Sequence, residues 1–210
     1  MGGYGRRKKG RRETKRVFVI VCEGGETEPI YFNRYKERGL NLTIEVPKNK
    51  YTDPVNLAKF AKEYIKKGKQ GEKERFDFKK GDKIWCVFDC DENPNEKISE
   101  ACKIAGKDVI MCLSNPSFEL WYLLHFVRIQ SKLWRDEVND RLKKYIRDYD
   151  KSEDVYDLLK KYRPVAIENA KNLNKKHEKT GTELICVESN PSTQVYAIVE
   201  EILKITANAP

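Results

Sequence analysis

The sequence predicts an α/β fold: a doubly wound, mostly parallel sheet flanked by helices, with a helical insertion. Short runs of apolar, largely β-branched residues recur along the chain, and helix-like segments separate them. Glycine or proline stands at several of the boundaries between them. Of the 210 residues, 39% are hydrophobic and 36% are charged, which is enough apolar material for a sheet covered by helices.

The first strand is predicted over residues 17–22, which read Val-Phe-Val-Ile-Val-Cys. An uninterrupted β-branched run of this kind is typical of a strand buried on both faces of a parallel sheet. Gly24 and Gly25 end the run, and Pro29 suits the first turn of a helix expected over residues 30–38. The core is therefore expected to begin with a strand, a turn and a helix.

Two further pairs of strand and helix are expected downstream. A strand over residues 42–46 precedes a helix over residues 54–68, whose apolar side chains recur at helical spacing. A third apolar strand over residues 84–88 precedes a helix over residues 96–105. Alternation of this kind indicates βαβ units.

The second half of the chain is expected to supply two more strands. A fourth strand over residues 109–113 precedes an apolar helix over residues 118–126. A fifth strand is predicted over residues 183–187, before a final helix over residues 193–205. Ser-Asn-Pro-Ser follows both strands, and an asparagine cap followed by proline predicts a helix start at each copy.

Between these strands the composition changes to charge-rich segments, which predict long amphipathic helices with Val138, Leu142, Val155 and Leu158 on apolar stripes. We interpret this region as a helical insertion. The predicted organisation is a disordered basic arm at residues 1–16, an α/β core at 17–127, the insertion at 128–181, and a closing strand and helix at 182–210.

Basic residues outnumber acidic ones, 42 to 33, and give a formal net charge of +9. This surplus favours an anionic partner such as nucleic acid, although a solvated surface explains it equally well. In the insertion, Trp134, Tyr145 and Tyr149 would either stack on bases or pack in the core. The predicted nucleic-acid contacts are Arg6, Arg7, Lys8, Lys9, Arg11, Arg12, Lys143 and Lys144.

The 6 cysteines form no C-x-x-C pair, so free thiols and a reducing compartment are expected. No apolar run approaches the roughly 18 residues of a membrane span, and the basic N-terminus lacks a signal-peptide pattern. We therefore expect a cytoplasmic protein with no membrane segment.

Acidic residues directly follow the first and third predicted strands. Glu23 follows the first, and Asp89 and Asp91 follow the third. In open parallel sheets, ligands bind beyond the carboxyl ends of strands, so these carboxylates converge if the two strands are neighbours. Oxygen ligands without a Cys or His cluster indicate Mg²⁺ or Mn²⁺. Glu28 would either add a ligand or serve as an ordinary acid at a helix N-terminus.

Four ordered motifs extend over nearly the whole chain: Val-Ile-Val-Cys-Glu23-Gly-Gly-Glu-Thr-Glu28, Phe88-Asp89-Cys90-Asp91, Ser114-Asn-Pro-Ser-Phe-Glu119-Leu-Trp121 and Asn190-Pro-Ser-Thr193. Together they resemble the motifs of the RloB-like proteins. That family is similar to the Toprim superfamily, in which a strand-end glutamate and an Asp-x-Asp bind metal for strand cleavage or joining.

The resemblance implies a Toprim-like sheet, with Asp89 and Asp91 as metal ligands and Glu23 as the general acid/base or a ligand. Glu119 is either an additional ligand or a partly buried helix acid, and His125 is expected to be a core histidine with its hydrogen bonds satisfied. The resemblance also implies an anti-phage locus and similarity to nucleases that act beside an ABC-type ATPase.

The predicted function is that of a Mg²⁺- or Mn²⁺-dependent endonuclease, which hydrolyses phosphodiester bonds of RNA, such as tRNA, or of DNA in anti-phage defence. The alternative is a non-catalytic module that binds nucleic acid or a partner ATPase in the same context. Neither the choice between DNA and RNA nor the oligomeric state follows from the sequence.

Overall fold

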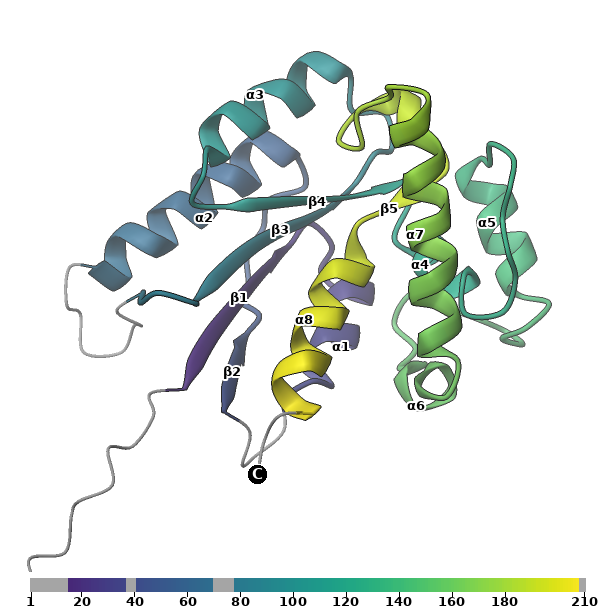
Figure 1. Ribbon diagram of the computed structural model, residues 1–210, viewed down its shortest axis with the longest axis horizontal. Helices are drawn as coiled ribbons and strands as arrows, with labels where there is room; N and C mark the ends of the chain where they lie inside the picture. Colours follow the sequence, from purple (N-terminus) through teal and green to yellow (C-terminus); the bar gives the residue numbers. More distant parts are fainter. Residues whose placement is uncertain (1–14, 37–40, 70–77, 208–210) are drawn as a thin grey trace, which may run out of the picture.

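The computed structural model describes residues 15–36, 41–69 and 78–207, and helices cover both faces of its sheet (Figure 1). The 5-stranded sheet has the order β2-β1-β3-β4-β5. β1 to β4 run parallel, and β5 is antiparallel to β4. The prediction of an α/β fold with a mostly parallel sheet is therefore confirmed. The strands are β1 (Arg16–Cys22), β2 (Leu42–Glu45), β3 (Lys83–Asp89), β4 (Ile110–Asn115) and β5 (Ser192–Thr193).

The helices form two layers, one on each face of the sheet (Figure 1). One layer consists of α2 (Pro54–Lys69) and α3 (Asn95–Ala105). The other packs α1 (Thr27–Asn33), α4 (Glu119–Leu123) and α8 (Val195–Ala207) on the sheet. The second layer is extended by α5 (Arg135–Leu142), α6 (Tyr156–Lys160) and α7 (Arg163–Lys179).

The strand runs are apolar without interruption because both faces of the sheet are covered. In β1, Phe18 and Ile20 belong to the core that contains α1 and α8, whereas Val19 and Val21 belong to the core beneath α2 and α3. Successive side chains of a strand point to opposite faces, so each of these positions is buried.

The strand order reverses between β1 and β3. Cys22 of β1 pairs with Val87 of β3, so the two strands are direct neighbours. From β1 the chain passes outward to β2 and then returns to β3 on the other side of β1. A reversal of this kind opens a crevice at the carboxyl ends of the two strands, where α/β proteins bind ligands.

The predicted strand over residues 183–187 is wrong. The segment bends over residues 184–186 and then enters the 3-10 helix η1 (Val187–Ser189). Asn115 Nδ2 donates to Val187 O at 2.9 Å, and Val187 N–H donates to Asn95 Oδ1 at 2.9 Å. Because side chains take up these backbone groups, they are not available for a strand ladder, and the short β5 is the fifth strand instead.

The two Ser-Asn-Pro-Ser segments do not start helices, contrary to the prediction. They meet at the pairing of β4 with β5, where Asn115 lies opposite Ser192, and both Asn-Pro peptide bonds are cis. The Asn115 amide binds the backbone of η1. Asn190 Nδ2 donates to Leu133 O at 2.8 Å, and Leu133 N–H donates to Asn190 Oδ1 at 2.9 Å. Each asparagine therefore fixes a distant loop.

The segment predicted to form long amphipathic helices is mostly made of short ones. α5 has 8 residues and α6 has 5, whereas α7 has 17. Val138, Leu142 and Val155 are buried as predicted, but Leu158 is exposed. The apolar stripes are therefore correct in part, and long helices are correct for α7 and wrong for α5 and α6.

Among the described residues, no helix combines the length and the apolar character needed to cross a membrane. The cysteines are free thiols, as predicted. Four of them are buried, and Cys102 and Cys186 are half-buried.

Candidate active site

The ends of β1 and β3 place Glu23 beside Asp89. Glu23 N–H donates to Val87 O at 2.9 Å, which extends the ladder between the strands past the end of β1. Asp89 N–H donates to Glu23 Oε2, also at 2.9 Å. This second bond holds the Glu23 carboxylate against the end of β3.

A tight turn after β3 brings Asp91 to the same edge of the sheet. Cys90 N–H donates to Ser114 O at 2.9 Å, so the turn is anchored on β4. Asp91 has φ of 39°, in the left-handed region that few residues other than glycine occupy, although aspartate tolerates it. Backbone in sparsely populated conformations is concentrated at functional sites.

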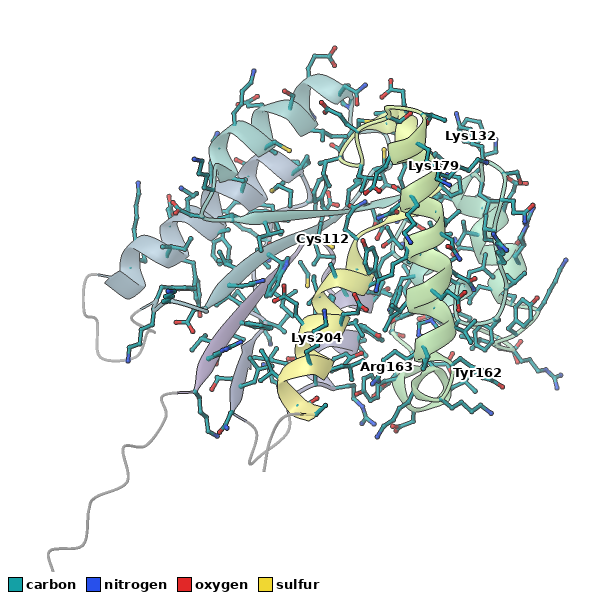
Figure 2. All side chains as sticks on the ribbon, in the orientation of Figure 1. Cys112, Lys132, Tyr162, Arg163, Lys179 and Lys204 are labelled. Atoms are coloured by element: carbon teal, nitrogen blue, oxygen red, sulfur yellow. The ribbon has the colours of Figure 1, made fainter. Side chains whose placement is uncertain are left out.

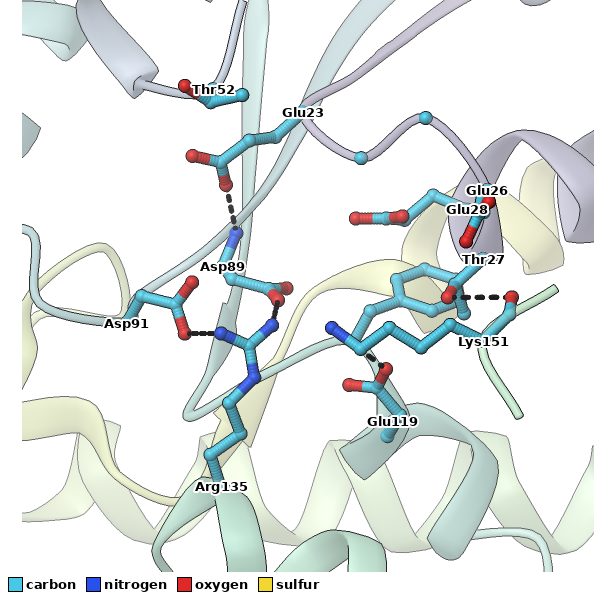
Figure 3. A pocket seen from close by; sticks show the side chains of 13 residues that line it. Glu23, Glu26, Thr27, Glu28, Thr52, Asp89, Asp91, Glu119, Arg135 and Lys151 are labelled. Carbon is cyan, nitrogen blue, oxygen red and sulfur yellow. Dashed lines mark hydrogen bonds and ion pairs between the residues drawn. The ribbon is translucent and has the colours of Figure 1, made fainter. Parts of the chain in front are cut away.

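A pocket of about 470 Å³ opens over these strand ends (Figure 3). The structure brings together every acid that was proposed for the site, and it adds two basic side chains. We call this pocket the acid pocket. It is lined by the acids Glu23, Glu28, Asp89, Asp91 and Glu119 and by the bases Arg135 and Lys151, among others.

Arg135, the first residue of α5, reaches between the two aspartates (Figure 3). Its Nη2 lies 3.1 Å from Asp89 Oδ2, and its Nη1 donates to Asp91 Oδ1. The guanidinium therefore offsets part of the negative charge of the Asp-x-Asp pair in this structure. Charge-assisted hydrogen bonds of this kind are stronger than those between neutral groups.

Glu28 and Glu119 occupy the opposite side of the acid pocket and are both buried. Lys151 Nζ lies 4.0 Å from Glu119 Oε1, too far for a hydrogen bond. Glu28 packs against Gly24, where an added Cβ would lie 2.1 Å from Glu28 Oε2. The glycine at position 24 therefore makes room for the Glu28 carboxylate.

Burial and mutual repulsion raise the pKa values of these acids. Burial is the largest cause for Glu23 and for Glu28, and it raises the pKa of each to about 7. Burial, together with the charges of Glu28 and Glu119, also raises the pKa of Asp89 well above its usual range, although Arg135 opposes the shift. Within the described residues, neither Asp89 Oδ1 nor Glu119 Oε2 has a hydrogen-bond partner.

The side chains of the acid pocket offer ligand atoms that suit a hard divalent cation. Its acids offer carboxylate oxygens, some of them unpartnered, and no Cys or His of the described chain lines the pocket. A cation would also relieve the repulsion between the acids. In the described residues, however, no three acidic, His or Cys side chains lie close enough together to hold an ion. Arg135 stands where Asp89 and Asp91 would share one.

The basic residues predicted to contact nucleic acid do not line the acid pocket in the described part of the chain. Lys143 and Lys144 follow α5 and are exposed. Those of the N-terminal arm, Arg6, Arg7, Lys8, Lys9, Arg11 and Arg12, lie outside the described residues.

His125 lies in the core, as predicted, but it is not fully satisfied, because its Nε2 has no hydrogen-bond partner among the described residues. Its side chain is buried, and its Nδ1 lies 2.9 Å from Trp121 O. Burial lowers the pKa of His125 to about 4, so the ring is neutral at physiological pH.

Sequence reasoning missed Arg135 and Lys151 as residues of the pocket. Both lie in a segment rich in cations, and no local pattern separates them from their neighbours. The three aromatic residues of the insertion were expected either to stack on bases or to pack in the core. Tyr149 is buried in the core. Tyr145 is exposed and stacks on Phe126, and Trp134 is exposed beside Arg135.

The family model described as RloB-like protein matches residues 18–202. The chain therefore belongs to the RloB-like family, as the resemblance indicated. A search of curated proteins and a search of solved structures found no match. The matched span contains every residue named above as lining the acid pocket.

Proposed function

We propose that this chain is a metal-dependent endonuclease that hydrolyses phosphodiester bonds of nucleic acid in the acid pocket. The observation that carries the proposal is the convergence of acids from β1, β3, α1 and α4 on one crevice, with carboxylate oxygens that lack partners. The proposal includes a Toprim-like sheet with an insertion at residues 128–181. It also includes the anti-phage setting and the ABC-type ATPase that the family resemblance implies.

Asp89 and Asp91 would hold Mg²⁺ or Mn²⁺, with Glu23, Glu28 and Glu119 available as further ligands. Bound there, the ion would polarise the scissile phosphodiester, lower the pKa of a bound water and stabilise the developing negative charge.

The side chains of the pocket have separate roles in this proposal. Arg135 would release Asp89 and Asp91, and its guanidinium would pair with a phosphate of the substrate. Lys151, which is held only loosely by Glu119, would contact a neighbouring phosphate. Glu23 lies against the end of β3 and would exchange a proton with the attacking water or the leaving oxygen.

A non-catalytic module that binds nucleic acid or a partner ATPase is the second candidate. The observation that favours it is the contact of Arg135 with both Asp89 and Asp91. An arginine that already binds both aspartates occupies the position between them that a metal ion would need.

A cleavage assay separates the two candidates. Labelled total RNA and plasmid DNA are incubated with the protein in Mg²⁺, in Mn²⁺ or in EDTA, with and without the ATPase partner, beside Glu23→Gln. We expect cleavage that requires the metal and that falls by about 10²- to 10⁴-fold in Glu23→Gln, as for loss of a general acid/base. Binding of nucleic acid without cleavage in every condition would support the second candidate.

A further inference from the structure

Trp134 is the exposed tryptophan of the described chain. Its exposed fraction is 66%, compared with 2% for Trp85 and 0% for Trp121. Single apolar side chains on a surface are common, so exposure alone assigns no role to this residue. A role is indicated instead by the fixed backbone that carries Trp134 and by its position beside the acid pocket.

Hydrogen bonds fix the backbone from Leu133 to the N–H of Trp134. The buried Leu133 exchanges two hydrogen bonds with the Asn190 amide, at 2.8 and 2.9 Å. Trp134 N–H donates to Glu137 Oε2 at 2.9 Å, at the start of α5. Little backbone entropy therefore remains to be lost when a ligand covers this ring, which favours binding.

The indole also borders the acid pocket. Trp134 lines a second cavity of about 730 Å³, which shares Glu23, Asp91 and Arg135 with the acid pocket. This volume lies within the range of roughly 300–1,000 Å³ that is typical of ligand sites. We call it the Trp134 cavity. A ligand in it would lie against the residues that we assign to catalysis.

Cations and acids both lie around the indole, and each could contact a different part of a nucleotide. Lys132 lies on the outside of the molecule (Figure 2), and its Nζ lies over one face of the Trp134 ring, 4.9 Å from the centroid. A base that stacks on the ring must therefore take the other face or displace this ammonium. Lys97 lines the Trp134 cavity and offers a second cation for a phosphate. Glu92 and Asp136 also line it, and their carboxylates would repel phosphate but accept hydrogen bonds from base amino groups.

We propose that Trp134 is a stacking platform for one base of a single-stranded nucleic acid, next to the position of cleavage. The inference rests on the proposed nuclease function and deepens it by naming the substrate class. Every base has a π-face, but in a duplex that face is covered by neighbouring bases. A base must therefore be unpaired and splayed out to cover the indole.

Tryptophan fluorescence tests the proposal, because the other two tryptophans are buried. Oligothymidylate, an abasic oligomer of the same length and a duplex are titrated into Glu23→Gln protein in Mg²⁺, so that binding is read separately from cleavage. We expect oligothymidylate to quench the emission, and the abasic oligomer and the duplex to quench it far less.

Affinity is then measured by polarisation of labelled oligothymidylate in the same Glu23→Gln background. Adding Trp134→Leu should weaken binding by about 5- to 100-fold, whereas adding Trp134→Phe, which keeps a stacking ring, should retain most of the affinity. Tyr145→Leu is the matched control, because Tyr145 is also exposed but does not line the Trp134 cavity.

The outcomes separate this inference from the proposed function. Undiminished binding by Trp134→Leu, equal quenching by the abasic oligomer, or no binding of any oligonucleotide overturns the stacking platform. If the wild type cleaves nucleic acid while Trp134→Leu binds normally, the nuclease stands and the platform fails. If stacking is observed but no metal ion supports cleavage, the platform stands and the proposed hydrolysis fails.

Discussion

The two sides of the acid pocket differ in how their negative charge is compensated. On the Arg135 side, the guanidinium binds both Asp89 and Asp91. On the Lys151 side, the ammonium reaches only to 4.0 Å from Glu119, and Glu119 Oε2 has no partner among the described residues. Asp89 belongs to both sides, because its Oδ2 faces Arg135 and its Oδ1 is unpartnered.

This difference indicates what a cation must do on entering the pocket. On the Lys151 side, a cation would meet carboxylate oxygens whose charge is only weakly offset by the distant Lys151 ammonium. On the Arg135 side it would have to displace an arginine that is already bonded to both aspartates. If the pocket binds a metal ion as proposed, Arg135 would stabilise the pocket without the ion, and its release would accompany binding.

The largest effect is expected from Asp89→Asn, because Asp89 serves both sides of the pocket. The change keeps the shape of the side chain and removes its charge, so metal-dependent cleavage should fall by about 10³-fold or more. Asp157→Asn is the matched control, since Asp157 forms an exposed ion pair with Arg34 and should leave cleavage unchanged. Equal activity of the two variants in a cleavage assay would remove Asp89 from the mechanism.

Gly24→Ala should impair the Lys151 side selectively. The new Cβ would lie 2.1 Å from Glu28 Oε2, so the flexible end of Glu28 must move. A displacement of about 1 Å in a catalytic group can cost on the order of 10²-fold in rate. Gly25→Ala is the control, because a Cβ there meets nothing within 4 Å. If steady-state kinetics show equal rates for both variants, the position of Glu28 does not matter for cleavage.

Arg135→Ala should destabilise the protein in EDTA by about 1–3 kcal/mol, because it leaves the nearly buried Asp89 without its charged partner. The loss should shrink when Mg²⁺ is added, since a bound ion stabilises the folded state in its place. Urea unfolding in EDTA and in Mg²⁺ measures both values. A loss that Mg²⁺ leaves unchanged contradicts the idea that the ion and the guanidinium compensate the same acids.

Lys151→Ala should have the smallest effect on stability, below about 1 kcal/mol. The ammonium is half-exposed and lies 4.0 Å from Glu119, beyond hydrogen-bonding distance. The same urea experiment, run beside Arg135→Ala, sharpens the contrast between the two sides. A loss as large as that of Arg135→Ala would mean that both sides are neutralised equally in the metal-free protein.

The sequence predicted the part of the site that is built by strands. Glu23 and Asp89 could be placed because an apolar run buried on both faces marks where a strand ends. That β1 and β3 are neighbours was only a condition of the argument, since strand order depends on contacts between distant segments. The structure shows that β1 and β3 are indeed neighbours in the sheet.

Arg135 could not be predicted as a residue of the site. Arg135 reaches the aspartates because Asn190 holds Leu133, a contact between residues 57 positions apart. The failed strand over residues 183–187 has a similar cause, because the Asn115 and Asn95 side chains take up backbone groups of Val187. Hydrogen bonds from distant side chains leave no periodic pattern in a sequence.

Calorimetric titration with Mn²⁺ tests most directly whether the acid pocket is a divalent-cation site. The wild type, Asp89→Asn and Asp157→Asn are titrated in the absence of nucleic acid. We predict saturable binding by the wild type and by Asp157→Asn, and its loss in Asp89→Asn. Absence of binding by the wild type, or equal binding by Asp89→Asn, would contradict the metal site.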